Sequence, residues 1–145
     1  MHWAAKRGDY DVLCQLQESG AALDMQASFD TKMRPIHWAS SDGKLKSIKF
    51  LLDHRQDINA QDGNGCSPVI IAAQYGRVET VIYLVKNGAD LNQRDVNGDT
   101  ALHWAAYKGF DEVAGVLMHF APHFKDLQDN YGQVRSFFLF FSFPV

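Results

Sequence analysis

The 145-residue sequence has little of several features that mark familiar classes of protein. Its two cysteines, Cys14 and Cys66, are too few for a disulfide framework, so we expect a reduced chain that is cytosolic or faces the cytosol. Lys and Arg number 14 against 17 Asp and Glu, and a net charge of −3 gives no reason to expect nucleic acid as a partner. No apolar run approaches the roughly 20 residues that cross a bilayer, so we expect no membrane insertion by this segment.

Motifs that carry chemistry are also missing. Nucleophilic catalysis requires a Ser or Cys beside a positioned base, and no spacing in this chain supplies one. The glycines fall one or two per repeat at turns and do not form a Gly-rich phosphate loop. We therefore expect no catalytic residue and no cofactor in this segment.

What the sequence does contain is an internal repeat, which decides the architecture before any local pattern does. A short motif ending in small residues recurs at offsets of 35, 33 and 33 residues. Its four copies are His-Trp-Ala-Ala at 2–5, His-Trp-Ala-Ser at 37–40, Ile-Ile-Ala-Ala at 70–73 and His-Trp-Ala-Ala at 103–106. A Gly follows each copy, at Gly8, Gly43, Gly76 and Gly109.

Each unit is predicted to contain two helices. Thr100 and Ser67 stand where an N-cap is needed, and Gly76 and Gly109 follow the first helix, where glycine readily ends it. The second helix then places apolar residues three and four apart, which gives it one apolar face. The members of this face are Leu45, Ile48, Leu51 and Leu52 in the second unit and Val78, Val81, Leu84 and Val85 in the third.

A unit of this kind cannot bury its apolar face alone, so we predict an all-α solenoid of about four helix-turn-helix repeats. The period and the segments 34–39, 87–92 and 100–105 resemble ankyrin repeats, with a repeat domain at 1–132 and a non-repeat tail at 133–145. Two departures stand out: Arg55 replaces the Gly that would end a helix, and the loop 24–35 is longer than its counterpart 92–101. Both ends interrupt a repeat, and we expect a longer parent protein.

The histidines raise the question of a metal site. His2, His37 and His103 occupy one column of the repeat, which spreads them along the solenoid, whereas zinc needs three or four ligands at one point. His119 and His123 are four residues apart, but no third ligand accompanies them. We expect structural histidines and no metal.

Three tryptophans, Trp3, Trp38 and Trp104, share the next column, with Ile71 in the third unit. They are either apolar wedges between repeats or anchors for a partner, because Trp is enriched at binding hot spots. The ankyrin resemblance places this helix on the concave face, with Arg7, Asp42, Tyr75 and Lys108 four residues further on. The candidate peptide-binding residues are Trp38, Trp3, Arg7, Asp42, Tyr75 and Trp104.

A closer resemblance is to the ankyrin region of palmitoyltransferases that carry an Asp-His-His-Cys catalytic domain. It rests on residues 1–5, the 35-residue step to 35–39, the Asp-Gly-Asn-Gly-Cys-Ser turn at 62–67 with 72–76, and 105–107. The resemblance implies a cytosolic module attached to transmembrane helices, in a parent protein of the Golgi or other endomembranes. In that family the ankyrin region recruits substrates through a short peptide motif rich in β-branched residues and ending in Gln-Pro.

The same resemblance aligns the family's groove Trp with Trp38 and its groove Asn with Arg7, a cation that only donates hydrogen bonds. The Asp-His-His-Cys motif itself is absent from the 145 residues. We predict a monomeric protein-interaction module that binds an extended peptide in a concave groove. The alternatives are a free-standing cytosolic ankyrin adaptor and an acyltransferase whose catalytic part lies elsewhere in the parent.

The tail holds five of the ten phenylalanines, within residues 137–143. Gly132 aligns with Gly98, yet the expected first helix of a fifth unit does not follow. We interpret the tail as an out-of-register end of the reading frame. If it is authentic, its apolar run is prone to aggregation or serves as a docking patch.

Overall fold

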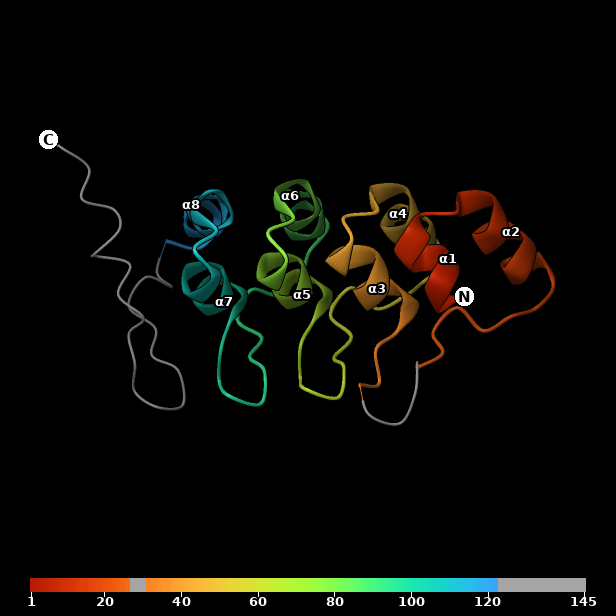
Figure 1. Cartoon of the computed structure of the whole chain (residues 1–145), viewed down its shortest axis with the longest axis horizontal. Coiled ribbons are helices and arrows are strands. Elements are labelled where there is room, and N and C mark those ends of the chain that lie inside the picture. The colour runs from red at the N-terminus through yellow and green to blue at the C-terminus, as the bar shows by residue number, and fades with distance from the viewer. Residues whose placement is uncertain (27–30, 123–145) are drawn as a thin grey trace, which may run out of the picture.

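The structure is a computed structural model that describes residues 1–26 and 31–122. These residues form eight helices in four successive pairs (Figure 1), which confirms the predicted all-α solenoid. The pairs are α1 (His2–Arg7) with α2 (Tyr10–Glu18), α3 (Pro35–Ser41) with α4 (Leu45–Asp53), α5 (Pro68–Gln74) with α6 (Val78–Lys86), and α7 (Ala101–Lys108) with α8 (Asp111–Phe120). The tip of the enlarged loop, the domain boundary at 132 and the Phe-rich tail lie outside the described residues and stay predictions.

The helices are arranged in two layers. The first helices of the repeats contact one another in the order α1, α3, α5 and α7, and the second helices do so in the order α2, α4, α6 and α8. Figure 1 shows α3, α5 and α7 between their partner helices and the connecting loops. Each repeat therefore packs mainly against its neighbours in the chain, as in other solenoids.

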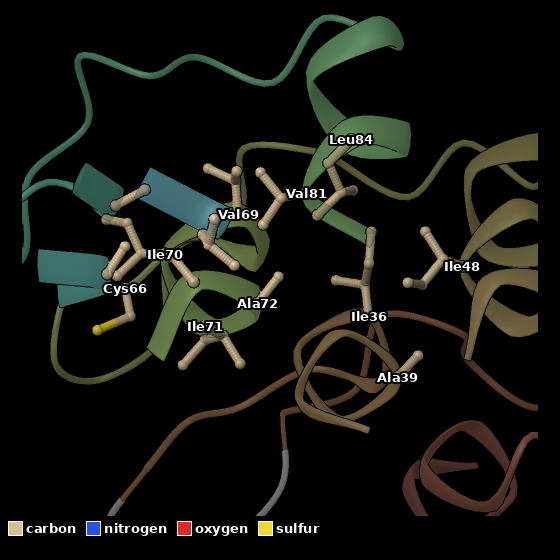
Figure 2. Close-up of a cluster of buried hydrophobic side chains, with 14 of the residues drawn as sticks. Ile36, Ala39, Ile48, Cys66, Val69, Ile70, Ile71, Ala72, Val81 and Leu84 are labelled. Atoms are coloured by element: carbon tan, nitrogen blue, oxygen red, sulfur yellow. The ribbon is translucent and has the colours of Figure 1, made fainter. Parts of the chain in front are cut away.

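The core fills the space between the layers. The first helices approach closely because each carries a buried alanine at the same position, Ala4, Ala39, Ala72 and Ala105. Figure 2 shows the larger side chains of the second and third repeats in one cluster, among them Ile36, Ile48, Val81 and Leu84. Burial of each such side chain contributes roughly 1.5–3 kcal/mol. Leu45, predicted on the apolar face of α4, is the first residue of that helix and remains 37% exposed.

The helix ends follow the sequence signals in part. Thr100 caps α7, with its Oγ1 3.5 Å from the backbone nitrogen of His103, whose Nδ1 accepts from the Thr100 N–H at 3.1 Å. Ser67 stands at the N-cap of α5 without making a capping bond, and Pro68 behind it has no N–H to satisfy. Arg55 adopts the left-handed conformation itself, with φ +64°, and so ends its helix in the manner expected of glycine.

His37 links a helix to the next loop. Its Nδ1 accepts from the backbone N–H of Arg34 at 3.0 Å, and its Nε2–H donates to the carbonyl of Ala60 at 2.8 Å. His2 bonds through Nε2 to the carbonyl of Met25, which lies the same 23 residues downstream. Burial lowers the pKa of His37, so its ring is neutral and both nitrogens are used by the backbone.

The loops also stack on one another. The N–H of Gly63 donates to the carbonyl of Thr31 at 2.7 Å, and that of Val96 to the carbonyl of Asn64 at 2.9 Å. Gly65 lies at this junction with φ +75°, and a Cβ there would stand 3.2 Å from the Cα of Asp95. Glycine is required at this position both by the backbone conformation and by the neighbouring loop.

The buried His37 makes stability depend on pH. In the unfolded chain its pKa returns to about 6.5, so as pH falls the unfolded state binds the extra proton and the free energy of unfolding decreases. We expect His37→Gln to flatten this loss between about pH 7 and pH 5 and to lower stability by about 1–3 kcal/mol at neutral pH. Urea unfolding at several pH values measures both effects. His119→Gln, which removes an exposed histidine, is the matched control, and an unchanged pH slope in His37→Gln would contradict the assignment.

The loop junction gives a second prediction. Gly65→Ala and Gly88→Ala both place an alanine at positive φ, which costs roughly 1–2 kcal/mol. Only the Gly65 Cβ meets backbone, because nothing lies within 4 Å of the Gly88 Cβ position. We expect Gly65→Ala to be the more destabilising by about 1 kcal/mol or more in urea unfolding. Equal losses for the two variants would show that the loops do not constrain each other.

Candidate functional site

The six predicted binding residues all lie in or directly after the first helices. Trp3 and Arg7 belong to α1, Trp38 to α3 and Trp104 to α7, while Asp42 and Tyr75 are the C-cap residues of α3 and α5. They therefore share one layer of the solenoid. The structure brings only part of this set into contact.

Trp3 and Trp38 line a common cavity, which we name the tryptophan pocket. Its volume is about 290 Å³, and it is lined by His2, Trp3, Lys6 and Trp38. The pocket forms where α1 packs against α3, so two successive repeats create it together. An indole ring offers a broad apolar surface, which suits a proline ring or a branched aliphatic side chain.

The two tryptophans differ in how far their side chains are buried. Trp3 is 74% exposed, whereas Trp38 is half-buried. The indole nitrogen of Trp38 is buried and has no hydrogen-bond partner among the described residues. An unpaired buried donor costs free energy, and no hydrogen bond within the described residues offsets this cost for the Trp38 indole.

Lys6, which the sequence reasoning missed, is the cation that contacts Trp38. Its Nζ lies 4.7 Å from the centroid of the Trp38 ring, a cation–π distance. Arg7, which the family alignment pairs with Trp38, instead lies over Trp3, with its Cζ 5.3 Å from that ring centroid. Lys6 and Arg7 are adjacent in α1 and carry the same charge, but their side chains lie over different tryptophan rings.

Trp104 is separate from the tryptophan pocket. Its indole N–H donates to Oδ2 of the buried Asp95 at 2.8 Å, and its ring packs edge-on against Tyr107 at 5.9 Å. Lys108 Nζ lies 5.9 Å from the Trp104 centroid. Between Trp38 and Trp104, Ile71 is buried in α5 and interrupts the aromatic column. The Trp104 side chain is thus fixed by a hydrogen bond to the loop before α7, and part of it remains exposed.

Asp42 and Tyr75 contribute less defined contacts. Asp42 Oδ1 accepts from the hydroxyl of Ser41 at 3.4 Å, and Tyr75 is 55% exposed. Neither side chain lines the tryptophan pocket. They lie between the pocket and Trp104 along the chain and along the layer.

A second cavity of about 600 Å³ lies at the C-terminal ends of α2 and α4. It is lined by residues at the ends of these two helices and in the segments that follow them, and none of the six predicted residues takes part. The lining residues are Gln17, Gly20, Ala21, Leu23, Asp24, Asp53, His54, Arg55 and Gln56.

Among the residues that the structure describes, the Cys66 thiol is withdrawn from solvent and no metal-ligand cluster is found. Cys66 is buried, and that burial, with Asp62 and Asp95 nearby, raises the pKa of its thiol to about 12, so it stays protonated at neutral pH. Within residues 1–26 and 31–122, no three His, Cys, Asp or Glu side chains gather as metal ligands would. None of the helices in these ranges is both long and apolar enough to span a membrane.

Comparison with protein families gives matches to a model of ankyrin repeats at residues 1–95 and 36–130. Together these matches cover most of the chain and include all eight helices. The resemblance drawn from the repeated motif is confirmed. Ankyrin repeats generally act as protein-interaction modules.

Among curated proteins, the chain is 52% identical over 108 residues to palmitoyltransferase Hip14 of Drosophila melanogaster. That alignment covers 74% of this chain and 17% of the relative. Palmitoyltransferase AKR1 of Naumovozyma castellii is 35% identical over 63 residues, covering 43% of this chain and 8% of the relative. Human palmitoyltransferase ZDHHC13 is 35% identical over 69 residues, covering 48% and 11%.

These relatives confirm the predicted likeness to palmitoyltransferases, although the chain spans less than a fifth of the length of each. The alignments, the family matches and the paired helices agree on one assignment. The chain belongs to the ankyrin repeat family.

Proposed function

We propose that this chain binds an extended, unstructured peptide at the tryptophan pocket and thereby recruits substrates for a protein S-acyltransferase. Support comes from the pocket itself, from the ankyrin repeats, and from the palmitoyltransferases to which the chain is similar. The observation that supports this proposal most directly is the half-buried Trp38 ring in the wall of an open cavity.

The size of the pocket favours a peptide side chain over a small-molecule ligand. Cavities for drug-sized ligands have volumes of about 300 to 1,000 Å³. The tryptophan pocket, at about 290 Å³, lies at the lower limit of this range. A single proline or β-branched residue can insert and stack on Trp38. Such anchors in central pockets dominate the affinity of many interfaces.

The remaining predicted residues extend the site along the same layer. A peptide anchored at Trp38 and running across the first helices next meets Asp42, then Tyr75, and then Trp104. The Asp42 carboxylate and the Tyr75 hydroxyl can form hydrogen bonds with the backbone of an extended segment, whose backbone groups have no internal partners. The recruited segment is therefore one that lacks structure before binding.

The acyl transfer itself belongs to a part of the parent that these 145 residues do not include. We propose that the parent is a membrane-bound protein S-acyltransferase of the Golgi or another endomembrane, with this monomeric module facing the cytosol. The names of the relatives support this context, while the described residues of this chain supply only the binding surface.

The alternative is a free-standing cytosolic adaptor unrelated to acylation. The full-length transcript distinguishes the two, because an acyltransferase parent continues into several apolar segments of about 20 residues and an Asp-His-His-Cys motif. A transcript encoding ankyrin repeats without either feature would establish the adaptor.

Removal of the Trp38 ring tests the proposed site. We expect Trp38→Ala to weaken binding of a β-branched peptide ending in Gln-Pro by about 2 kcal/mol or more, because the anchor loses its stacking surface. Isothermal titration with the 145-residue chain measures the affinity, and circular dichroism shows that the variant remains folded.

Phe120→Ala is the matched control, since it removes an aromatic ring that is 41% exposed on α8, outside the first-helix layer. It should leave the affinity unchanged. A folded Trp38→Ala variant that binds as tightly as the original chain would exclude the tryptophan pocket as the binding site.

A further inference from the structure

Charge is divided unevenly between the two layers of helices. The first helices carry Lys6, Arg7 and Lys108 and no Asp or Glu, although the chain as a whole has a net charge of −3. The second helices carry more acidic than basic side chains. The layer that holds the proposed site is therefore the basic one.

Two of these cations, Lys6 and Arg7, lie over the tryptophan rings of the pocket, but their charges are compensated differently. Arg7 Nε lies 3.5 Å from Asp9 Oδ2, so its charge is partly balanced within α1 and the turn that follows. Within residues 1–26 and 31–122, no carboxylate lies at ion-pair distance from Lys6 Nζ, which rests 4.7 Å from the Trp38 centroid. Lys6 is thus held by a ring face, and its charge is available to a ligand.

The position of Lys6 has a consequence for any ligand of Trp38. A neutral side chain that stacks on the covered part of the ring must displace the ammonium and lose the cation–π contact. A ligand with a carboxylate next to its apolar group offers the displaced ammonium a new partner, and a charge-assisted hydrogen bond can then replace the contact.

We infer that the tryptophan pocket selects a peptide with an acidic residue beside its apolar anchor, and that Lys6 is the residue that determines this preference. The inference rests on the proposed function and adds to it the chemistry of the bound segment. Asp42, which follows α3 along the layer, repels a second acidic group placed further along the peptide.

The far end of the layer repeats the arrangement. Lys108 Nζ lies 5.9 Å from the Trp104 centroid and 5.7 Å from that of Tyr107. Figure 1 shows α1 and α7 toward opposite ends of the row of first helices. A segment that spans the row is therefore expected to be acidic near both ends and neutral or basic between them.

Two synthetic peptides test the preference. Both have blocked termini and identical flanks, and they differ only in the central pair, Val-Val-Glu-Glu-Gln-Pro against Val-Val-Gln-Gln-Gln-Pro. We expect the Glu peptide to bind the 145-residue chain about fivefold more tightly in about 50 mM NaCl, with the difference shrinking in about 500 mM NaCl as the charges are screened.

Variants of Lys6 then assign the preference to one residue. Lys6→Met should abolish the discrimination and leave affinity for the Gln peptide equal or higher, since no ammonium has to leave the ring. Lys6→Glu should reverse the preference toward a Lys-Lys version of the peptide. Lys49→Met is the matched control, because it removes an exposed lysine from α4 in the other layer and should preserve the preference.

The outcomes separate this inference from the proposed function. Equal affinity for the Glu and Gln peptides, lost on Trp38→Ala, would overturn the role of Lys6 and keep the peptide site. Discrimination that survives Lys6→Met would likewise overturn it. If neither peptide binds, and vesicles with anionic lipid bind through Lys6 instead, the proposed function fails together with the inference.

Discussion

The close packing of one first helix on the next is the contact on which the rest of the molecule depends. Ala4, Ala39, Ala72 and Ala105 are each buried at this contact, and a larger side chain there would force neighbouring repeats apart. A single repeat has too little apolar surface to fold alone, so the helices, the stacked loops and the pocket exist only because repeats associate. Stability in such a chain is distributed along a line of interfaces.

That packing also creates the candidate site. Trp3 and Trp38 come from successive repeats, and their rings share a cavity because α1 lies against α3. Alanines occupy the closest contact between these helices, whereas Trp3 is exposed and Trp38 is half-buried beside it. The same contact therefore supplies both the core and the tryptophan pocket, and a change that loosens it would affect both.

The architecture could be read from the sequence because it depends on a repeated pattern. The period and the glycines after the first helices reflect local rules that hold in every unit, and the Thr100 cap reflects a local rule at its own helix. Ser67 and Leu45 show where such rules fail, since capping depends on the geometry of one helix start and burial depends on where a helix begins against its neighbour.

The site was less predictable for a related reason. The tryptophan column was visible in the sequence, and the structure gives Trp3 and Trp38 a common pocket. The choice of Lys6 rather than Arg7 over Trp38 depends on the conformations of long side chains between two repeats, which no alignment of columns encodes. Similarly, the hydrogen bond from Trp104 to Asp95 depends on the conformation of the loop that precedes α7.

The interruption of the aromatic column at Ile71 has a consequence for affinity. It divides the layer into two aromatic sites, Trp3 with Trp38 and Trp104 with Tyr107, and α5 lies between them. A partner that engages both sites through one continuous segment binds the second site at a high effective concentration set by the length of the spacer. Modest contacts at each end then multiply, and the spacer length discriminates among partners as strictly as the anchor residues do.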